Sequence, residues 1–154
     1  MNINWKRLIK ITIITFIIGG LFSFLTMKGM DAFKALKKPI EVPGIIFPIV
    51  WSVLYLLMSI SLYLVLESND ENKIKDLIIY SVQLIVNSIW TLIFFGLKNY
   101  LLSFIWLLLL LALIIYMLIV FFKINKTSAY INIPYVLWVI FAGYLNLGIY
   151  LLNR

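Results

Sequence analysis

Residues 42–66 read VPGIIFPIVWSVLYLLMSISLYLVL and contain no charged side chain. A helix needs about 20 apolar residues to cross the roughly 30 Å hydrocarbon core of a bilayer, so this stretch is long enough to span one. It opens with two prolines, Pro43 and Pro48, which precede a bulky ring at Trp51. Pro43 suits the first turn of a helix, whereas Pro48 is expected to bend the helix about one turn further on.

The rest of the chain follows the same pattern. It is 64% hydrophobic and 12% charged, whereas a soluble domain carries about a quarter charged residues. The charges cluster and leave four further charge-free stretches, at 11–27, 77–97, 99–122 and 127–153. The first of these is short, but Trp5 and snorkelling Lys and Arg stems can extend it.

The sequence therefore predicts an all-α membrane protein, a single domain over residues 1–154 built as a bundle of five transmembrane helices. The expected helices are residues 5–27, 43–66, 76–97, 100–122 and 130–152. The first stretch is expected to be a span and not a secretory leader, because it is longer than a usual leader core and no small-residue cleavage site precedes Lys28. Its Gly19, Gly20 and Ser23 are small residues that let helices approach closely.

Short polar connections favour antiparallel neighbours, and the exception is the basic loop 28–42, KGMDAFKALKKPIEV. Met30, Phe33 and Leu36 recur there at helical spacing. The loop is expected to lie on the interface as an amphipathic turn, to fold over the mouth of the bundle, or simply to be solvated. Basic residues divide almost equally between the two sides, so the positive-inside rule leaves the orientation open.

Several kinds of chemistry are excluded by composition. The chain has no Cys and no His, so disulfides and thiolate or imidazole metal sites are ruled out, and we expect no metal. The charge-free stretches hold no ionisable relay of the kind that pumps use, and no carboxylate pair or Ser–His arrangement suggests a conventional enzyme. The net charge of +7 indicates contact with anionic lipid or an anionic ligand, and not nucleic acid.

Three predicted helices carry aromatic and polar side chains at helical spacing. The stripes are Phe47, Trp51 and Tyr55; Gln83, Asn87 and Trp90; and Tyr135, Trp138, Ala142 and Asn146. At about 1.5 Å of rise per residue they reach similar depths, toward the side from which loop 28–42 emerges. They either line a ligand cavity with a lid or form plain bundle core, in which Gln83 and Asn87 bond to neighbouring helices. Trp5 and Trp106 are typical of an interfacial belt.

Three stretches in order resemble one known family. PGIIFPIVWSVLYLLM (43–58), QLIVNSIWTLIFFG (83–96) and PYVLWVIFAGYLNLGIYLLN (134–153) are similar to the motifs of helices two, three and five in the translocator protein family. That family is also called tryptophan-rich sensory proteins or the peripheral-type benzodiazepine receptor family. It often has paired prolines where this chain reads Val42-Pro43 and Pro48-Ile49.

The resemblance implies a five-helix bundle, commonly a homodimer, that binds protoporphyrin IX, benzodiazepine-receptor-type ligands and, in animal members, cholesterol. It also implies a role in tetrapyrrole transport or light-dependent porphyrin breakdown. With Tyr55 added from its stripe, the implied pocket consists of Phe47, Pro48, Trp51, Tyr55, Asn87, Trp90, Trp138, Ala142 and Asn146.

We therefore expect a multi-pass, receptor-like protein of a bacterial cell membrane that binds porphyrin as a ligand, with no covalently held cofactor. The macrocycle would stack on Trp51 and Trp138, and its propionates would meet Lys34, Lys37 or Lys38 on the loop. Light-driven porphyrin degradation, with a redox role for the two tryptophans, is an attached hypothesis. A tetrapyrrole transporter and a purely structural membrane partner are the alternatives.

Overall fold

The computed structural model describes residues 3–25 and 33–154. Residues 26–27 of the first predicted span, the first part of the loop with Met30, and the side chain of Ser23 lie outside the described residues. Within these limits the chain forms helices and no strand. The helices are α1 (Trp5–Leu25), α3 (Ile46–Leu66), α4 (Lys73–Thr91), the π-helical η1 (Leu92–Gly96), α5 (Tyr100–Ile124), α6 (Lys126–Tyr130) and α7 (Ile133–Leu152).

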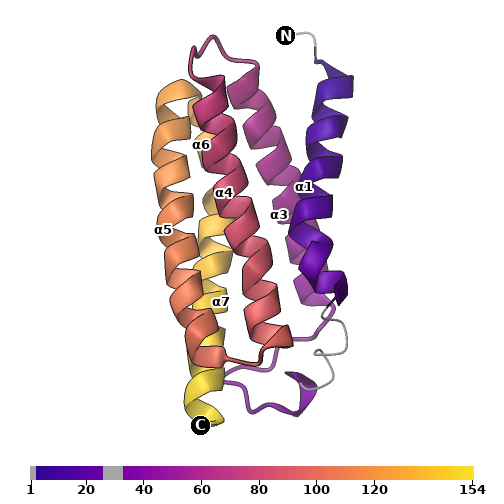
Figure 1. Ribbon diagram of the computed structural model, residues 1–154, viewed down its shortest axis with the longest axis vertical. Helices are drawn as coiled ribbons and strands as arrows, with labels where there is room; N and C mark the ends of the chain where they lie inside the picture. Colours follow the sequence, from indigo (N-terminus) through magenta and orange to yellow (C-terminus); the bar gives the residue numbers. More distant parts are fainter. Residues whose placement is uncertain (1–2, 26–32) are drawn as a thin grey trace.

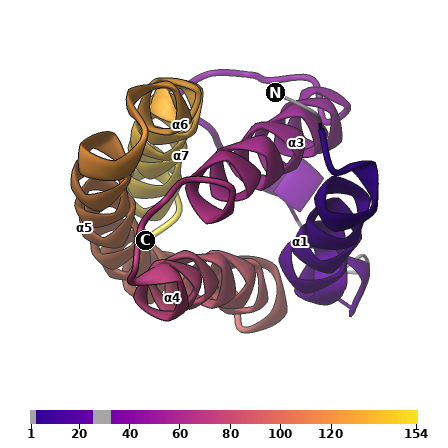
Figure 2. The same cartoon turned by 90° about the horizontal axis from the view of Figure 1, so that it is seen from above.

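The long helices run side by side and alternate in direction (Figure 1). We call the end that carries residues 33–45 and the C-terminus the lower end. Seen from above, α1, α3, α6 with α7, α5 and α4 surround a common core (Figure 2). Helix α1 packs against both α3 and α4, and α5 packs against both α4 and α7.

Four segments of the described chain are long and apolar enough to cross a membrane: Ile46–Leu66, Lys73–Gly96, Tyr100–Ile124 and Lys126–Leu152. The remaining predicted span, residues 5–27, corresponds to α1, which has 21 residues. The all-helical prediction is confirmed, and four to five of the helices suit membrane crossing.

Three helix starts differ from the sequence prediction. Helix α7 begins at Ile133 and not at residue 130, because the short helix α6 precedes it. Helix α3 begins at Ile46, whose amide donates to the carbonyl of Pro43 at 2.9 Å. Pro48 therefore stands in the first turn, where a helix has no internal acceptor for the amide that proline lacks, so the predicted bend is wrong. Helix α4 begins at Lys73, so Asp76 lies within its first turn.

Polar groups hold α1 along its length. Arg7 pairs with Glu67 at 2.5 Å near the upper end. In the middle, the hydroxyls of Thr15 and Tyr80 lie 2.7 Å apart, and Ser88 Oγ donates to the carbonyl of Ile18 at 2.5 Å. In a membrane such groups must find partners inside the bundle, and here they fix where α1 sits.

Helix α5 contributes a narrow stripe to the core. Its buried apolar residues are Leu107, Leu110, Ile114, Met117 and Phe121, spaced alternately by three and four positions. Other apolar side chains of α5 either pack partly against this core, as Leu111 and Leu118 do, or are exposed, as Ile105 and Ile119 are. The indole N–H of Trp106 donates to the carbonyl of Val86 at 2.8 Å, which ties α5 to α4. The place of Trp106 in an interfacial belt stays a prediction.

The described part of the basic loop crosses the lower end of the bundle (Figure 1). The amide of Lys37 donates to Oδ1 of Asn153 at 3.0 Å, and Nδ2 of Asn153 donates back to the Lys37 carbonyl at 2.8 Å. The ring of Pro39 lies so close to Gly148 that a Cβ there would overlap it. Phe33 and Leu36 pack against the core, so the loop folds over the bundle mouth, one of the arrangements expected from the sequence.

Candidate ligand-binding site

A cavity of about 630 Å³ opens at the lower end between α1, α3, α4 with η1, and the loop. Its volume lies within the range of about 300–1,000 Å³ that is usual for small-molecule sites. The lining residues are Phe16, Gly20, Phe33, Lys34, Lys38, Glu41, Val42, Gly44, Phe47, Pro48, Trp51, Ser52, Tyr55, Trp90, Thr91 and Phe95. The wall is mostly apolar and aromatic, with charged groups confined to the loop.

Helix α3 supplies one aromatic wall. Phe47, Trp51 and Tyr55 follow one another at four-residue intervals, so they share a helix face, and all three line the cavity. The Trp51 ring lies 5.6 Å from that of Tyr55, between centroids, and 6.2 Å from that of Tyr135. Tyr55 donates its hydroxyl to the carbonyl of Gly19 at 2.8 Å, which fixes this wall against α1.

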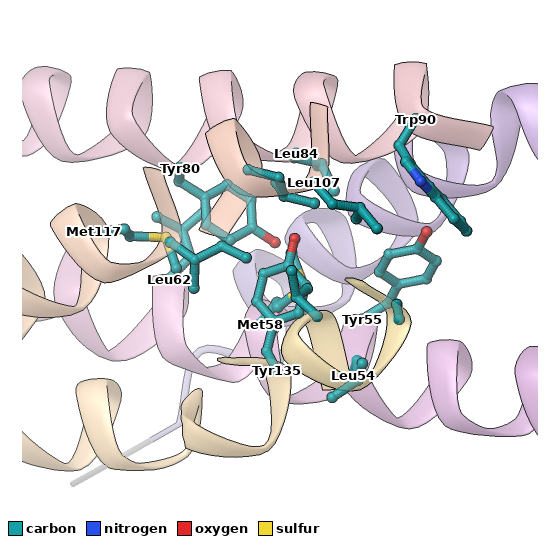
Figure 3. Close-up of a cluster of buried hydrophobic side chains, with 14 of the residues drawn as sticks. Leu54, Tyr55, Met58, Leu62, Tyr80, Leu84, Trp90, Leu107, Met117 and Tyr135 are labelled. Atoms are coloured by element: carbon teal, nitrogen blue, oxygen red, sulfur yellow. The ribbon is translucent and has the colours of Figure 1, made fainter. Parts of the chain in front are cut away.

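Helix α4 and η1 supply the facing wall. Trp90 and Tyr55 approach each other from α4 and α3 (Figure 3). Phe33 of the loop makes edge contacts with Phe47, Phe94 and Phe95, at centroid distances of 6.0, 5.9 and 5.7 Å. Such edge-to-face arrangements are the favoured geometry of aromatic pairs, and here they close the lower side of the cavity.

A lysine stands at the cavity edge in an unusual setting. The side chain of Lys38 is only 8% exposed although it belongs to a loop. Its ammonium lies 5.0 Å from the Phe33 ring centroid, donates to the carbonyls of Lys34 at 3.4 Å and Leu36 at 3.3 Å, and stands 3.7 Å from Glu41 Oε2. The cavity thus combines an aromatic wall with the largely buried positive charge of Lys38.

Comparison with known proteins shows the family of this chain. The model of the TspO/MBR family matches residues 11–152. The chain belongs to the TspO/MBR family. It is 39% identical to protein CrtK of Rhodobacter capsulatus over 124 residues, which covers 79% of this chain and 78% of that protein. It is 31% identical to tryptophan-rich protein TspO of Archaeoglobus fulgidus over 152 residues, 97% of this chain and 99% of that protein.

The family motifs predicted eight pocket residues and the stripe on the second predicted helix added Tyr55. The structure brings five of these nine to the cavity: Phe47, Pro48, Trp51, Tyr55 and Trp90. Of the three loop lysines, Lys34 and Lys38 line it. Lys37 does not, because its backbone is held at the end of α7 by Asn153. The remaining residues predicted from the motifs are Asn87, Trp138, Ala142 and Asn146; they do not line the cavity, and their role as ligand contacts stays a prediction.

Asn87 and Asn146 join helices in this TspO/MBR chain. Asn87 Nδ2 donates to the Tyr135 hydroxyl at 2.7 Å, and that hydroxyl donates to Gln83 Oε1 at 3.0 Å. Asn146 Oδ1 accepts from Trp90 Nε1 at 3.2 Å and from Ser103 Oγ at 2.9 Å. Its Nδ2 donates to the Tyr100 carbonyl at 2.7 Å. The bonds of Gln83 and Asn87 match the alternative in which these two amides link neighbouring helices, and Asn146 behaves in the same way.

Trp138 and Ala142 do not line the cavity. The Trp138 ring lies 5.9 Å from that of Phe47 and 5.5 Å from that of Phe141, and Ala142 is buried. Trp138 thus contacts a ring that lines the cavity, that of Phe47.

Sequence reasoning missed several residues at the cavity, among them Phe16, Gly20, Phe33 and Phe95. Phe16 and Gly20 are spaced by four and share a face of α1, which was a usable signal. Phe33 carried the helical spacing noted in the loop, and Phe95 lies within the second family motif. These residues lie outside the three stripes of aromatic and polar side chains at helical spacing, which predicted the cavity residues.

Proposed function

We propose that this chain spans the membrane five times and binds tetrapyrroles of the protoporphyrin IX type, and benzodiazepine-receptor-type ligands, in the cavity of the lower end. The observation that carries the proposal is the aromatic cavity with a sheltered lysine at its edge. A flat macrocycle suits Trp51 and Trp90, because aromatic rings gain from stacked or edge contact beyond the burial of their area. The acid groups of such a ligand suit the cationic loop.

The test is a titration of detergent-solubilised protein with protoporphyrin IX in the dark, followed by tryptophan fluorescence. Trp51→Phe is expected to weaken binding by at least about tenfold, because it removes part of the stacking wall. Trp5→Phe is the matched control, since Trp5 is exposed at the start of α1 and far from the cavity lining. Equal affinity of the parent and Trp51→Phe would show that protoporphyrin IX does not bind in this cavity.

Light-dependent porphyrin degradation is the second candidate function. It is favoured by the contact of Trp51 with Tyr55 and Tyr135, because these are oxidisable rings beside the expected ligand. Dioxygen would serve as the oxidant. Illumination of the complex should bleach the porphyrin faster than illumination of free porphyrin, and Trp51→Phe and Trp138→Phe should slow this. Bleaching at the rate of free porphyrin would rule it out.

A transporter of tetrapyrroles is the alternative. Above the cavity Met58, Leu62 and Met117 are almost completely buried in the core (Figure 3), which supports binding over a continuous pore. Directional porphyrin flux into sealed proteoliposomes would favour the transporter. We further propose that the protein is a homodimer in a bacterial cell membrane, in contact with its lipids. The mass of the protein in nanodiscs tests the dimer.

A further inference from the structure

We propose that Lys38 is the residue by which the cavity recognises a carboxylate, and that Glu41 is a built-in competitor which a ligand carboxylate replaces. This inference rests on the proposed binding function and names the part of that site that sets its selectivity.

The surroundings of Lys38 make its charge available to the cavity. Its side chain is 8% exposed, and a sheltered ammonium is costly unless it is paired. Two carbonyl acceptors at 3.3 and 3.4 Å and the face of Phe33 compensate for part of this cost. These partners are neutral, so they hold the ammonium in place without cancelling its charge.

Glu41 is the carboxylate nearest to that ammonium among the described ion pairs, and it is held loosely. Its side chain is 81% exposed, and its Oε2 stands 3.7 Å from Lys38 Nζ, beyond hydrogen-bonding distance. Pairs with an exposed partner contribute little, because water and salt screen them. Both residues line the cavity, so a ligand carboxylate that arrives from the cavity side can approach the ammonium more closely than Glu41 does.

The other two loop lysines are placed differently. Lys37 is exposed, does not line the cavity, and has its backbone fixed to Asn153. Lys34 lines the cavity but is exposed, so solvent screens its charge more than that of Lys38. We therefore assign carboxylate recognition to Lys38 alone.

The ligand class follows from this geometry. A carboxylate on Lys38 would have its carbon skeleton directed toward Phe33 and Phe47, which contact each other beside the ammonium. The favoured ligand is therefore a flat apolar ring system that carries an acid group at its edge. A neutral ester of the same ring system keeps the apolar contacts and loses the charge-assisted bond.

The experiment compares protoporphyrin IX with its dimethyl ester, both titrated in the dark against the parent, Lys38→Met, Glu41→Gln and the matched control Lys37→Met. Lys38→Met should weaken binding of the acid by about tenfold or more, because hydrogen bonds to charged groups are the strong ones, and should leave the ester unchanged. Glu41→Gln should tighten binding of the acid several-fold without affecting the ester. Lys37→Met should change neither, and Lys38→Arg should restore preference for the acid.

The outcomes separate this inference from the proposed function. If the parent binds neither porphyrin, the proposed function fails and this inference fails with it. If the parent binds both but Lys38→Met weakens them equally, Lys38 is structural and only the carboxylate assignment is overturned. If Lys38→Met does not fold, Glu41→Gln decides, because unchanged or weaker binding of the acid contradicts the competitor role.

Discussion

Gly19 and Gly20 are neighbours in α1 and meet different surroundings. A Cβ on Gly19 would lie 2.5 Å from Cζ of Tyr55, whereas a Cβ on Gly20 would have no atom within 4 Å. The first glycine lets α1 approach α3 closely enough for the Tyr55 hydroxyl to reach its carbonyl. The second leaves open space that belongs to the cavity.

Gly19→Ala should therefore destabilise the protein by about 1–3 kcal/mol, the usual cost of forcing extra volume into a packed contact. Gly20→Ala, one residue along the same helix, should be neutral or slightly stabilising, because alanine is the better helix former and nothing opposes its methyl group. Thermal unfolding of both variants in detergent gives the comparison. Equal melting temperatures would mean that α1 and α3 are not in close contact at Gly19.

A larger residue at Gly20 should affect binding and leave stability unchanged. Gly20→Leu places an apolar side chain in the cavity, so affinity for protoporphyrin IX should fall by about tenfold or more, as expected for lost room in a pocket. The melting temperature should stay near that of Gly20→Ala. Undiminished binding by Gly20→Leu would place the ligand elsewhere.

At the scale of single residues, the sequence predicted which aromatic rings face inward more reliably than it predicted the hydrogen-bond partners of the polar side chains. Trp51 and Tyr55 line the cavity as their spacing implied, because a helix fixes the direction of residues four apart. The spacing could not tell whether Asn87 and Asn146 would contact a ligand or another helix. Their partners, such as Tyr135 and Tyr100, come from distant parts of the chain.

Among the elements, the basic loop depends on α7 for its position. The Asn153 side chain makes two hydrogen bonds to the backbone of Lys37, and Pro39 packs beside Gly148. This clasp joins the loop to the last turn of α7. It also explains why Lys37, although basic and adjacent to Lys38, is turned away from the cavity.

Asn153→Ala should free the loop at the clasp. Each lost hydrogen bond contributes about 0.5–1.5 kcal/mol, so amide hydrogen exchange over residues 33–42 should accelerate by about tenfold. Arg154→Ala, at the adjacent exposed position, is the control. Unchanged exchange in Asn153→Ala would show that the loop is held by Phe33 and Leu36 alone.

The start of α3 depends on a turn that the sequence does not predict. A helix that begins at Pro43 would have Pro48 more than one turn inside it. The turn from Pro43 to Ile46 delays the helix, which places Pro48 where it is tolerated. Sequence alone does not reveal such a turn, since Gly44 and Ile45 are compatible with either conformation.

On the scale of the whole molecule, Asn146 connects three helices. It receives hydrogen bonds from Trp90 of α4 and Ser103 of α5, and it donates to the Tyr100 carbonyl at the start of α5. Because Asn146 lies on α7, these bonds join α4, α5 and α7. They support Trp90 from behind, so the cavity wall depends on them.

Asn146→Ala should destabilise the bundle by about 2 kcal/mol, since three interhelical bonds at about 0.6 kcal/mol each are lost in a membrane protein. Thermal unfolding measures this directly. Affinity for protoporphyrin IX should fall less than in Trp51→Phe, because Asn146 does not line the cavity. If the binding free energy for protoporphyrin IX fell by more than the free energy of unfolding, Asn146 would instead be a ligand contact.

The all-helical class and the four segments suited to membrane crossing were readable from the charge pattern, because the bilayer sets how much apolar length a span needs. The placement of the helices around one another was not readable. It depends on contacts such as Thr15 with Tyr80 and Ser88 with Ile18, which join residues far apart in sequence. The full lining of the cavity was therefore not readable from the sequence either, since α1 contributes to its wall.

The narrow buried stripe of α5 has a consequence for the history of the chain. Leu107, Leu110, Ile114, Met117 and Phe121 must each fill a defined volume. Their outward neighbours need only dissolve in hydrocarbon, so one apolar residue serves there as well as another. The lipid-facing positions of α5 are therefore expected to exchange one apolar residue for another during evolution, while the five buried positions keep side chains of similar size. Related sequences should differ most at the lipid-facing positions.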